Sequence, residues 1–263
     1  MGDACILVVD QGTTGTSAYM IDEQGGIVAS ADEEFPQYFP QAGWVEHDPD
    51  EIWRSVISVV GRVLGDSADR WKPVAVGITN QRETTVVWDR STGRPVARAI
   101  VWQCRRTAAM CEELRRRGLD AEVRGRTGLV IDAYFSGPKV RWLLNHTPNG
   151  QSRASRGELA AGTIDSWLLW KLTGGRLHGT DPTNASRTML YNIHTRQWDE
   201  TLCQELGVPV EILPTVQPSR GSFGDTDPGA FLGLRLPILG VAGDQQAALF
   251  GQACFENGAA KNT

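Results

Sequence analysis

Cysteine is scarce in this chain, and the cysteines that are present lie far apart. The 263 residues include only five, at Cys5, Cys104, Cys111, Cys203 and Cys254. Their odd number and the lack of any C-x-x-C pair exclude a disulfide framework and give no sign of a zinc site. The sequence therefore predicts a reduced, cytoplasmic protein.

An excess of positive charge and a long apolar run are also missing. The formal net charge is -5, which disfavours nucleic acid as a partner because its phosphate backbone selects basic faces. No apolar stretch approaches the ~20 residues of a membrane span. The N-terminal segment MGDACILVVDQG has no basic n-region and is interrupted early by an acidic residue, so it is not expected to be a signal peptide.

The remaining pattern predicts an α/β fold. Continuous apolar runs joined by short turns indicate consecutive antiparallel strands at 5–9, 17–21 and 27–29. Asp48-Pro49 followed by Glu51 is a typical helix start. Further strands are expected at 74–79, 84–88, 96–102, 188–193 and 237–242, and further helices at 105–117, 137–147, 164–172, 199–206 and from 244 onward. Early antiparallel strands followed by alternation indicate a mixed sheet flanked by helices.

The turn DQGTTGTS after the first strand is the first candidate site. Backbone N–H groups and hydroxyls over Gly12, Thr13, Thr14 and Gly15 could converge on a phosphate. Asp10 could hold Mg²⁺, which prefers one or two carboxylates together with phosphate oxygens. A plain hairpin turn is the alternative, because glycine and threonine are common in turns and strands. Neither a Walker loop nor a G-x-G-x-x-G motif is present.

Two more candidates lie at strand ends. Arg82 and Glu83 offer donors and acceptors side by side, which suits a small polyhydroxylated molecule. The alternative is a surface ion pair without function. Asp244 stands between a buried strand and a helix, where it could accept a substrate proton. An equally good interpretation is that Asp244 only caps the N-terminus of the helix.

Seven segments in order carry a family resemblance: DQGTTGTSAYMID, PQAGWVEHDPDEIW, GITNQRETTVVWD, AIVWQCRRT, YFSGPKVRWLL, TDPTNASRTMLYNIHTRQWD and GVAGDQQAALFGQ. Together they resemble the glycerol kinases of the FGGY carbohydrate kinase family. The resemblance implies an actin/hexokinase-like (ribonuclease H-like) fold. It also implies ATP-dependent, Mg²⁺-assisted phosphorylation of glycerol to sn-glycerol 3-phosphate.

The resemblance assigns the acceptor side by position. It implies that Arg82 and Glu83 bind the glycerol hydroxyls, that Tyr134 completes the pocket and that Trp102 forms an apolar wall. The Asp of the GDQQ motif would be the general base on the terminal hydroxyl, which makes Asp244 catalytic. The same motif places Gln245 next to the substrate.

The nucleotide side is assigned in the same way, with one departure. The resemblance implies that Asp10 faces Mg²⁺, and that Thr13 and Thr14 face the phosphates of ATP. Many members of the family read Ser-Ser-Arg after DQGTT, whereas this chain reads Gly15-Thr16-Ser17. Ser17 therefore replaces an arginine, and a fixed positive charge near the phosphates is lost.

The resemblance also bears on domain organisation. Residues 1–263 correspond to the N-terminal, glycerol-binding lobe, and the C-terminal, adenine-binding lobe of the family is expected to be absent. Two alternatives stay open: a kinase of the same family that acts on another polyol or a sugar, and a non-catalytic polyol-binding fragment. The partners implied are glycerol and ATP or ADP, and a homo-oligomer is left open.

Overall fold

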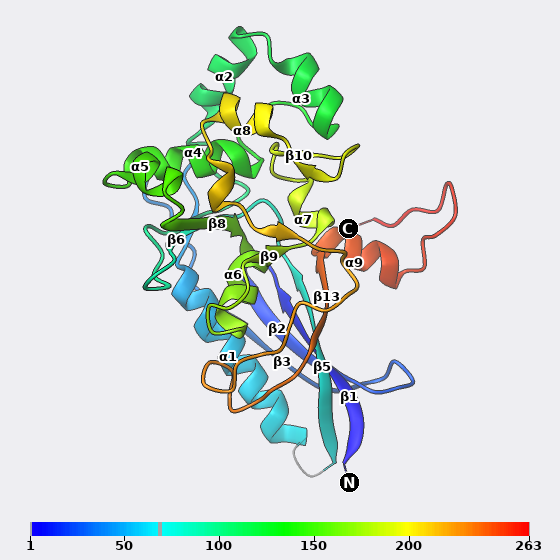
Figure 1. The fold of residues 1–263 in the computed structure, drawn as a ribbon. Coiled ribbons are helices and arrows are strands. Elements are labelled where there is room, and N and C mark those ends of the chain that lie inside the picture. The colour runs from blue at the N-terminus through cyan, green and yellow to red at the C-terminus, as the bar shows by residue number, and fades with distance from the viewer. Residues whose placement is uncertain (1, 68–69, 263) are drawn as a thin grey trace.

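The fold consists of two stacked regions, each built on its own sheet. A computed structural model describes residues 2–67 and 70–262. A five-stranded sheet forms one end of the molecule, and a four-stranded sheet with several helices forms the other (Figure 1). The chain enters the second sheet first at Glu46–His47, returns to the first sheet at Trp71–Asn80, and then passes to the second sheet again after Asn80. None of the described helices is both long and apolar enough to cross a membrane.

The five-stranded sheet is mixed, as the sequence predicts. Its strands are β1 (Asp3–Gln11), β2 (Gly15–Ile21), β3 (Ile27–Glu34), β5 (Trp71–Asn80) and β13 (Ile238–Gly243), in the order β13-β5-β1-β2-β3. The pairs β1–β2 and β2–β3 are antiparallel, whereas β5 lies parallel to both β1 and β13. The ends of β5 and β13 therefore meet at the same edge, with Gly243 opposite Asn80.

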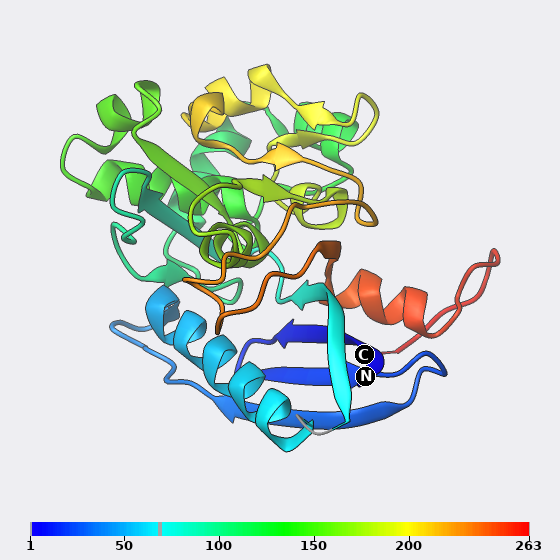
Figure 2. The ribbon, with the colours of Figure 1, turned by 60° about the horizontal axis from the view of Figure 1, so that its bottom comes forward.

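Helix α1 (Pro49–Ser67) covers one face of this sheet (Figure 2). Asp48 caps it, because its Oδ1 accepts the backbone N–H groups of Asp50 (2.8 Å) and Glu51 (3.2 Å). Glu51 does not complete a capping box, since its carboxylate accepts a hydrogen bond from the Tyr38 hydroxyl instead. The apolar face of α1 is fully buried against the sheet and α6 (Ile164–Leu172), through Ile52, Val56, Val59, Val60 and Val63.

The second region contains the four-stranded sheet. Its strands are β4 (Glu46–His47), β7 (Ala99–Ile100), β6 (Thr85–Asp89) and β8 (Leu159–Thr163), in that order. The helices around it are α2 (Ala108–Arg116), α3 (Asp120–Thr127), α4 (Ser136–His146), α5 (Gly150–Ser155) and α8 (Glu200–Leu206). Leu114, Leu143 and Ile131 belong to its separate apolar core.

The remaining elements are short. They are β9 (Gly179–Thr180), α7 (Pro182–Ala185), β10 (Tyr191–Asn192), β11 (Gln197–Trp198), a 3₁₀ turn (Val210–Ile212), β12 (Thr215–Val216) and α9 (Asp244–Gly251). Most of the strand predicted at 188–193 is a turn, because the Thr188 hydroxyl donates to the Ala185 carbonyl and accepts the Leu190 N–H. The strand predicted at 96–102 is also shorter, and the helix predicted at 105–117 begins at Ala108.

Candidate active site

The segment Gln81–Thr84 joins the two sheets and carries the first site residues. Glu83 has a φ of 61°, a left-handed conformation that costs a non-glycine residue ~1–2 kcal/mol. Three donors hold its carbonyl oxygen in place: the Thr85 hydroxyl at 3.0 Å, the Ser136 hydroxyl at 3.1 Å and the Lys139 ammonium at 3.2 Å. The left-handed turn directs the neighbouring side chains of Arg82 and Glu83 to different partners.

Arg82 reaches the start of α9. Its Nε lies 3.2 Å from Oδ1 of Asp244, and its terminal nitrogen donates to Oε1 of Gln246 at 3.3 Å. The Nε–Oδ1 distance is that of an ion pair, but the angles are not those of a hydrogen bond. Arg82 Nε is therefore a buried donor without an acceptor among the described residues. Such a group is rare in a folded protein and is normally matched by water or a ligand.

Asp244 is the first residue of α9 and is not its cap. Gly243 occupies the cap position, and the helix has no side-chain capping hydrogen bond. The capping interpretation of Asp244 is therefore wrong. Its carboxylate accepts the N–H of Gln245 at 2.6 Å and is partly exposed. Within the described part of the chain, the side chain of Gln245 makes no hydrogen bond to another site residue.

Glu83 is paired with a residue that the sequence did not single out. Its Oε1 accepts a hydrogen bond from Nε of Arg187 at 2.6 Å, and its side chain is 2% exposed. Burial raises the pKa of Glu83, while the neighbouring cations, Arg187 first, oppose that rise. The alternative of a surface ion pair between Arg82 and Glu83 is therefore wrong, because each side chain pairs with a distant residue.

Aromatic rings form one wall beside Glu83. The rings of Trp102 and Tyr134 are 5.5 Å apart, and the Arg187 guanidinium lies 5.8 Å from the Tyr134 ring. Burial, followed by the charge of Glu83, raises the pKa of the Tyr134 hydroxyl. The structure thus brings Arg82, Glu83, Tyr134 and Asp244 to one place at the junction of the two sheets.

The turn between β1 and β2 closes on itself and is tied to this wall. The Gly12 N–H donates to the Gly15 carbonyl at 2.9 Å, so it is already used within the hairpin. The Thr13 hydroxyl accepts a hydrogen bond from Nε1 of Trp102 at 2.9 Å, and Gln81 donates to the Gly12 carbonyl at 3.0 Å. Thr14 is exposed. The phosphate contacts of this turn stay a prediction.

Asp10 lies close to Asp244. Burial raises the pKa of Asp10, and the charge of Asp244 adds to that rise. Ser17 stands directly opposite Asp10 on β2, and Thr79 stands opposite it on β5. The Thr79 hydroxyl is buried and has no hydrogen-bond partner among the described residues.

These two carboxylates can be compared with what a metal ion requires. Residues 2–67 and 70–262 contain no group of three or more His, Cys, Asp or Glu side chains that could hold a metal. Mg²⁺ does not need such a group, because it typically binds one or two carboxylates together with water and phosphate oxygens. Asp10 and Asp244 therefore fit Mg²⁺ and do not fit a zinc site.

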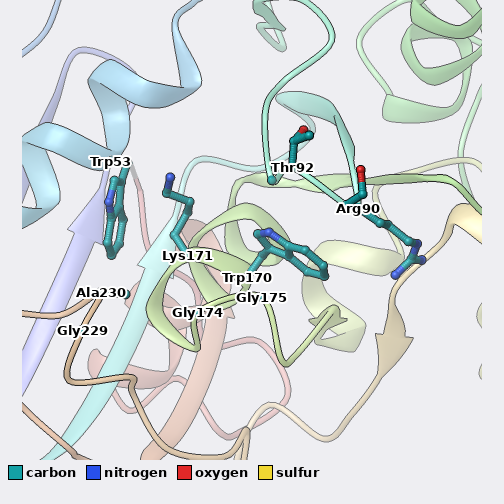
Figure 3. Close-up of a pocket in the computed structure, with 11 residues that line it drawn as sticks. Trp53, Arg90, Thr92, Trp170, Lys171, Gly174, Gly175, Gly229 and Ala230 are labelled. Atoms are coloured by element: carbon teal, nitrogen blue, oxygen red, sulfur yellow. The ribbon is translucent and has the colours of Figure 1, made fainter.

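A separate cavity of about 560 Å³ lies between α1, α6 and the turn after β6 (Figure 3). Lys171 stands between the rings of Trp53 and Trp170 in this view, and Gly93, Gly174 and Gly175 also line the cavity. Asp50 is 3.8 Å from the Lys171 ammonium. None of the predicted site residues lines this cavity, so its size does not mark the place of the chemistry.

Comparisons with known proteins identify the family of the chain. The model of the FGGY family of carbohydrate kinases, N-terminal domain, matches residues 5–251. The chain is 56% identical over 259 residues to a glycerol kinase of Carboxydothermus hydrogenoformans, covering 98% of the chain and 52% of that protein. It is 59% identical over 262 residues to a glycerol kinase of Ralstonia nicotianae, again covering 98% and 52%.

Solved structures show the same fold. The crystal structure of Plasmodium falciparum glycerol kinase with ADP has a TM-score of 0.93 at 35% identity, and covers 98% of this chain and 52% of that one. Gluconate kinase from Lactobacillus acidophilus has a TM-score of 0.85 at 22% identity, covering 95% and 50%. The predicted fold class is confirmed. The chain spans about half the length of the curated relatives that it matches.

Proposed function

The chain belongs to the FGGY family of carbohydrate kinases, and from this premise we propose that residues 1–263 form the acceptor-binding lobe of an ATP-dependent glycerol kinase. The reaction would convert glycerol to sn-glycerol 3-phosphate. Relatives that are 56% and 59% identical over nearly the whole chain carry the name glycerol kinase. The other substrates of this fold, such as gluconate, belong to structures only 22% identical, and these support the fold alone.

The convergence of Arg82, Glu83, Tyr134 and Asp244 carries the proposal. Each hydroxyl of a triol can donate and accept a hydrogen bond, so it needs a donor and an acceptor from the protein. Arg82 Nε supplies a buried donor that has no hydrogen-bond acceptor among the described residues, and the carboxylates supply acceptors. The Trp102 and Tyr134 rings supply an apolar surface for the carbon chain. Together these groups orient a small polyol and exclude water from one side of it.

Transfer requires proton removal from the hydroxyl that attacks. We assign this role to Asp244, which is partly exposed at the edge of the sheet and lies near enough to Asp10 for its charge to raise the pKa of Asp10. The terminal oxygen of glycerol forms a bond to the γ-phosphorus, the bond from that phosphorus to ADP breaks, and the hydroxyl proton passes to Asp244. Most of the rate enhancement comes from positioning the two reactants.

The nucleotide side rests on the turn between β1 and β2. Gly12, Thr13, Thr14 and Gly15 are proposed to face the phosphates, with Asp10 turned toward Mg²⁺. Neutralising the phosphate charge is what Mg²⁺ supplies in reactions of this kind. Because Ser17 lies opposite Asp10, an arginine at that position would have stood next to the carboxylate. Its absence leaves Asp10 without that positive neighbour.

Acceptor binding is tested on the chain itself. We expect isothermal titration calorimetry to show glycerol binding at least tenfold tighter than erythritol or xylulose. Arg82→Ala should weaken glycerol binding at least tenfold, because the buried donor is lost. Arg94→Ala, at an exposed position in the turn after β6, is the matched control and should bind normally. Equal binding of all three polyols would contradict the assignment of glycerol.

The catalytic role is tested when the second half of a glycerol kinase relative is supplied on the same chain. Asp244→Asn should then reduce phosphoryl transfer by about 10² to 10⁴, the range of general base catalysis. Glycerol affinity should change less than threefold. Strong residual turnover in this variant would remove Asp244 from the mechanism.

A further inference from the structure

Lys139 is a fully buried lysine beside the candidate acceptor pocket. It lies on α4 with a relative exposure of 0%. Its ammonium donates to the carbonyl oxygen of Glu83 at 3.2 Å and to the carbonyl oxygen of Tyr134. Glu83 and Tyr134 come from different segments of the chain, and one nitrogen holds both backbones. The resemblance to known kinases assigned no role to this lysine.

Packing alone does not account for a lysine at this buried position. No ion pair of Lys139 is found in the described residues, although Glu83 and Asp132 lie near enough for their charges to act on it. Burial lowers the pKa of Lys139 to about 7. Burying the amino group of a lysine without a paired carboxylate destabilises a fold whether the nitrogen is charged or neutral, and an apolar side chain of similar volume would pack better.

The carbonyl oxygens of Glu83 and Tyr134 indicate the structural role of the Lys139 nitrogen. Glu83 is held in a left-handed conformation with φ of 61°, which a non-glycine residue keeps only when its surroundings enforce it. The hydroxyls of Thr85 and Ser136 contact the same carbonyl, but neither of them reaches Tyr134. Among these three donors, only Lys139 contacts the carbonyl oxygens of both Glu83 and Tyr134.

We infer that Lys139 is a positioning residue for the acceptor pocket, whose buried ammonium sets the spacing between Glu83 and Tyr134 and thereby the preference for a triol. This inference rests on the proposed function, because it takes glycerol as the molecule that both residues contact. Lys139 does not touch the substrate in this scheme. It affects glycerol binding only indirectly, by holding the backbones of Glu83 and Tyr134 in place.

The test compares Lys139→Met with Val140→Ala in the full 263-residue chain. Methionine matches the apolar stem of lysine as far as its Cε atom and removes every donor. Val140 is the next residue of α4 and is 2% exposed, so its truncation disturbs the same core without touching the two carbonyls. Calorimetry measures the dissociation constants of glycerol and of ethylene glycol, which lacks one carbon and one hydroxyl. Thermal unfolding shows which variants are folded.

The expected result separates positioning from stability. Lys139→Met should weaken glycerol binding at least tenfold and reduce the preference for glycerol over ethylene glycol to threefold or less. Val140→Ala should lower the melting temperature and leave that preference as in the wild type. Lys139→Gln, which retains an amide donor, should fall between Lys139→Met and the wild type.

Two outcomes would overturn the inference. One is a folded Lys139→Met chain that binds glycerol with wild-type affinity, and the other is a loss of preference in Val140→Ala as large as in Lys139→Met. If Lys139→Met does not fold, Lys139→Gln decides by the same criteria. Failure of the wild-type chain to bind glycerol would instead contradict the proposed function, so the two failures are distinguishable.

Discussion

Nε of Arg82 lies 3.2 Å from Oδ1 of Asp244, and this contact joins the ends of two parallel strands. Arg82 follows β5 and Asp244 follows β13, and these strands run side by side with Gly243 opposite Asn80. In open α/β sheets, ligands bind in the crevice outside the carboxyl ends of the strands. The Arg82–Asp244 contact therefore lies where the topology of the sheet expects a substrate.

Removing the charge of Asp244 should change the titration of Asp10. The pKa of Asp10 is raised first by burial and then by the charge of Asp244. In Asp244→Asn only the effect of burial remains, so the pKa of Asp10 should fall toward its usual range. Carboxyl ¹³C chemical shifts followed by NMR against pH measure this. Asp225→Asn, at an exposed position, is the control and should leave the Asp10 titration unchanged.

The titration of Asp10 in Asp244→Asn also tests whether Asp10 and Asp244 can bind Mg²⁺ together. If the Asp10 titration is the same in Asp244→Asn and in the wild type, the two carboxylates are not close enough to share a cation. The fit of Mg²⁺ to Asp10 and Asp244 would then be wrong, whereas the acceptor pocket around Glu83 would be unaffected.

Gly243 should tolerate no side chain. A Cβ at this position would lie 2.6 Å from Cδ of Arg82, well inside van der Waals contact. Gly243→Ala should push Arg82 away from Asp244, weaken glycerol binding about tenfold and destabilise the fold by roughly 1–3 kcal/mol. Calorimetry and denaturant unfolding measure the two effects.

Gly251→Ala is the matched control for that experiment. Gly251 ends the same helix, and nothing lies within 4 Å of a Cβ placed there. Alanine has a higher helix propensity than glycine, so this variant should be as stable as the wild type or slightly more stable, with unchanged glycerol affinity. A wild-type affinity in Gly243→Ala would show that Arg82 is not positioned by this close contact.

Much of the five-stranded sheet could be predicted from the sequence, because its signals are local. The apolar runs of β1 and β2 are separated by short turns, and these require antiparallel neighbours. Asp48 and Pro49 mark the start of α1 through chemistry confined to one helical turn. The strand β8 was missed because Leu159–Thr163 reads LAAGT, a run of small residues with little strand propensity.

The site could be predicted only in part, because its partners are distant along the chain. Arg82 and Glu83 are neighbours in the sequence, yet Arg82 reaches Asp244 and Glu83 reaches Arg187. The left-handed φ of Glu83 is an energetically unfavourable conformation that no local pattern announces. Arg187 lies within the family motif TDPTNASRTMLYNIHTRQWD. Its place in that motif is the one sequence signal that could have identified Arg187 as a site residue.

The contact between Trp102 and Thr13 links the apolar wall to the turn between β1 and β2. Nε1 of Trp102 donates to the Thr13 hydroxyl at 2.9 Å. We expect Trp102→Phe and Thr13→Val each to destabilise the fold. The double variant should cost about 1 kcal/mol less than the sum of the two single losses, the usual net value of one hydrogen bond.

Denaturant unfolding of the wild type, the two single variants and the double variant measures this coupling free energy. Thr14→Val is the control at the neighbouring exposed position, and we expect no coupling with Trp102→Phe. Strictly additive losses for Thr13 would mean that the wall and the turn are held independently.

His47 should make the fold sensitive to acid. It is fully buried, with Nε2 at 2.5 Å from Oε1 of Gln37 and Nδ1 at 3.4 Å from Nε2 of Gln81. Burial lowers the pKa of His47 from 6.5 to about 4. The unfolded chain therefore binds the proton more readily than the folded one. Its contribution to stability is fully present above pH 6.5 and is lost as the pH falls toward 4, by up to roughly 3 kcal/mol.

Burial gives His178 a lowered pKa of about 3, so it acts with the same sign as His47. His47→Gln should therefore flatten the decline of unfolding free energy between pH 6.5 and 4 without abolishing it. His194→Gln, at an exposed position, should retain the wild-type slope.

Because Gln81 also donates to the carbonyl of Gly12, protonation of His47 should disturb the turn between β1 and β2 before the whole fold melts. Amide hydrogen exchange of Gly12, whose N–H donates to the Gly15 carbonyl, measures this at pH 5, and protection equal to that at pH 7 would show that the turn does not depend on the neutral imidazole.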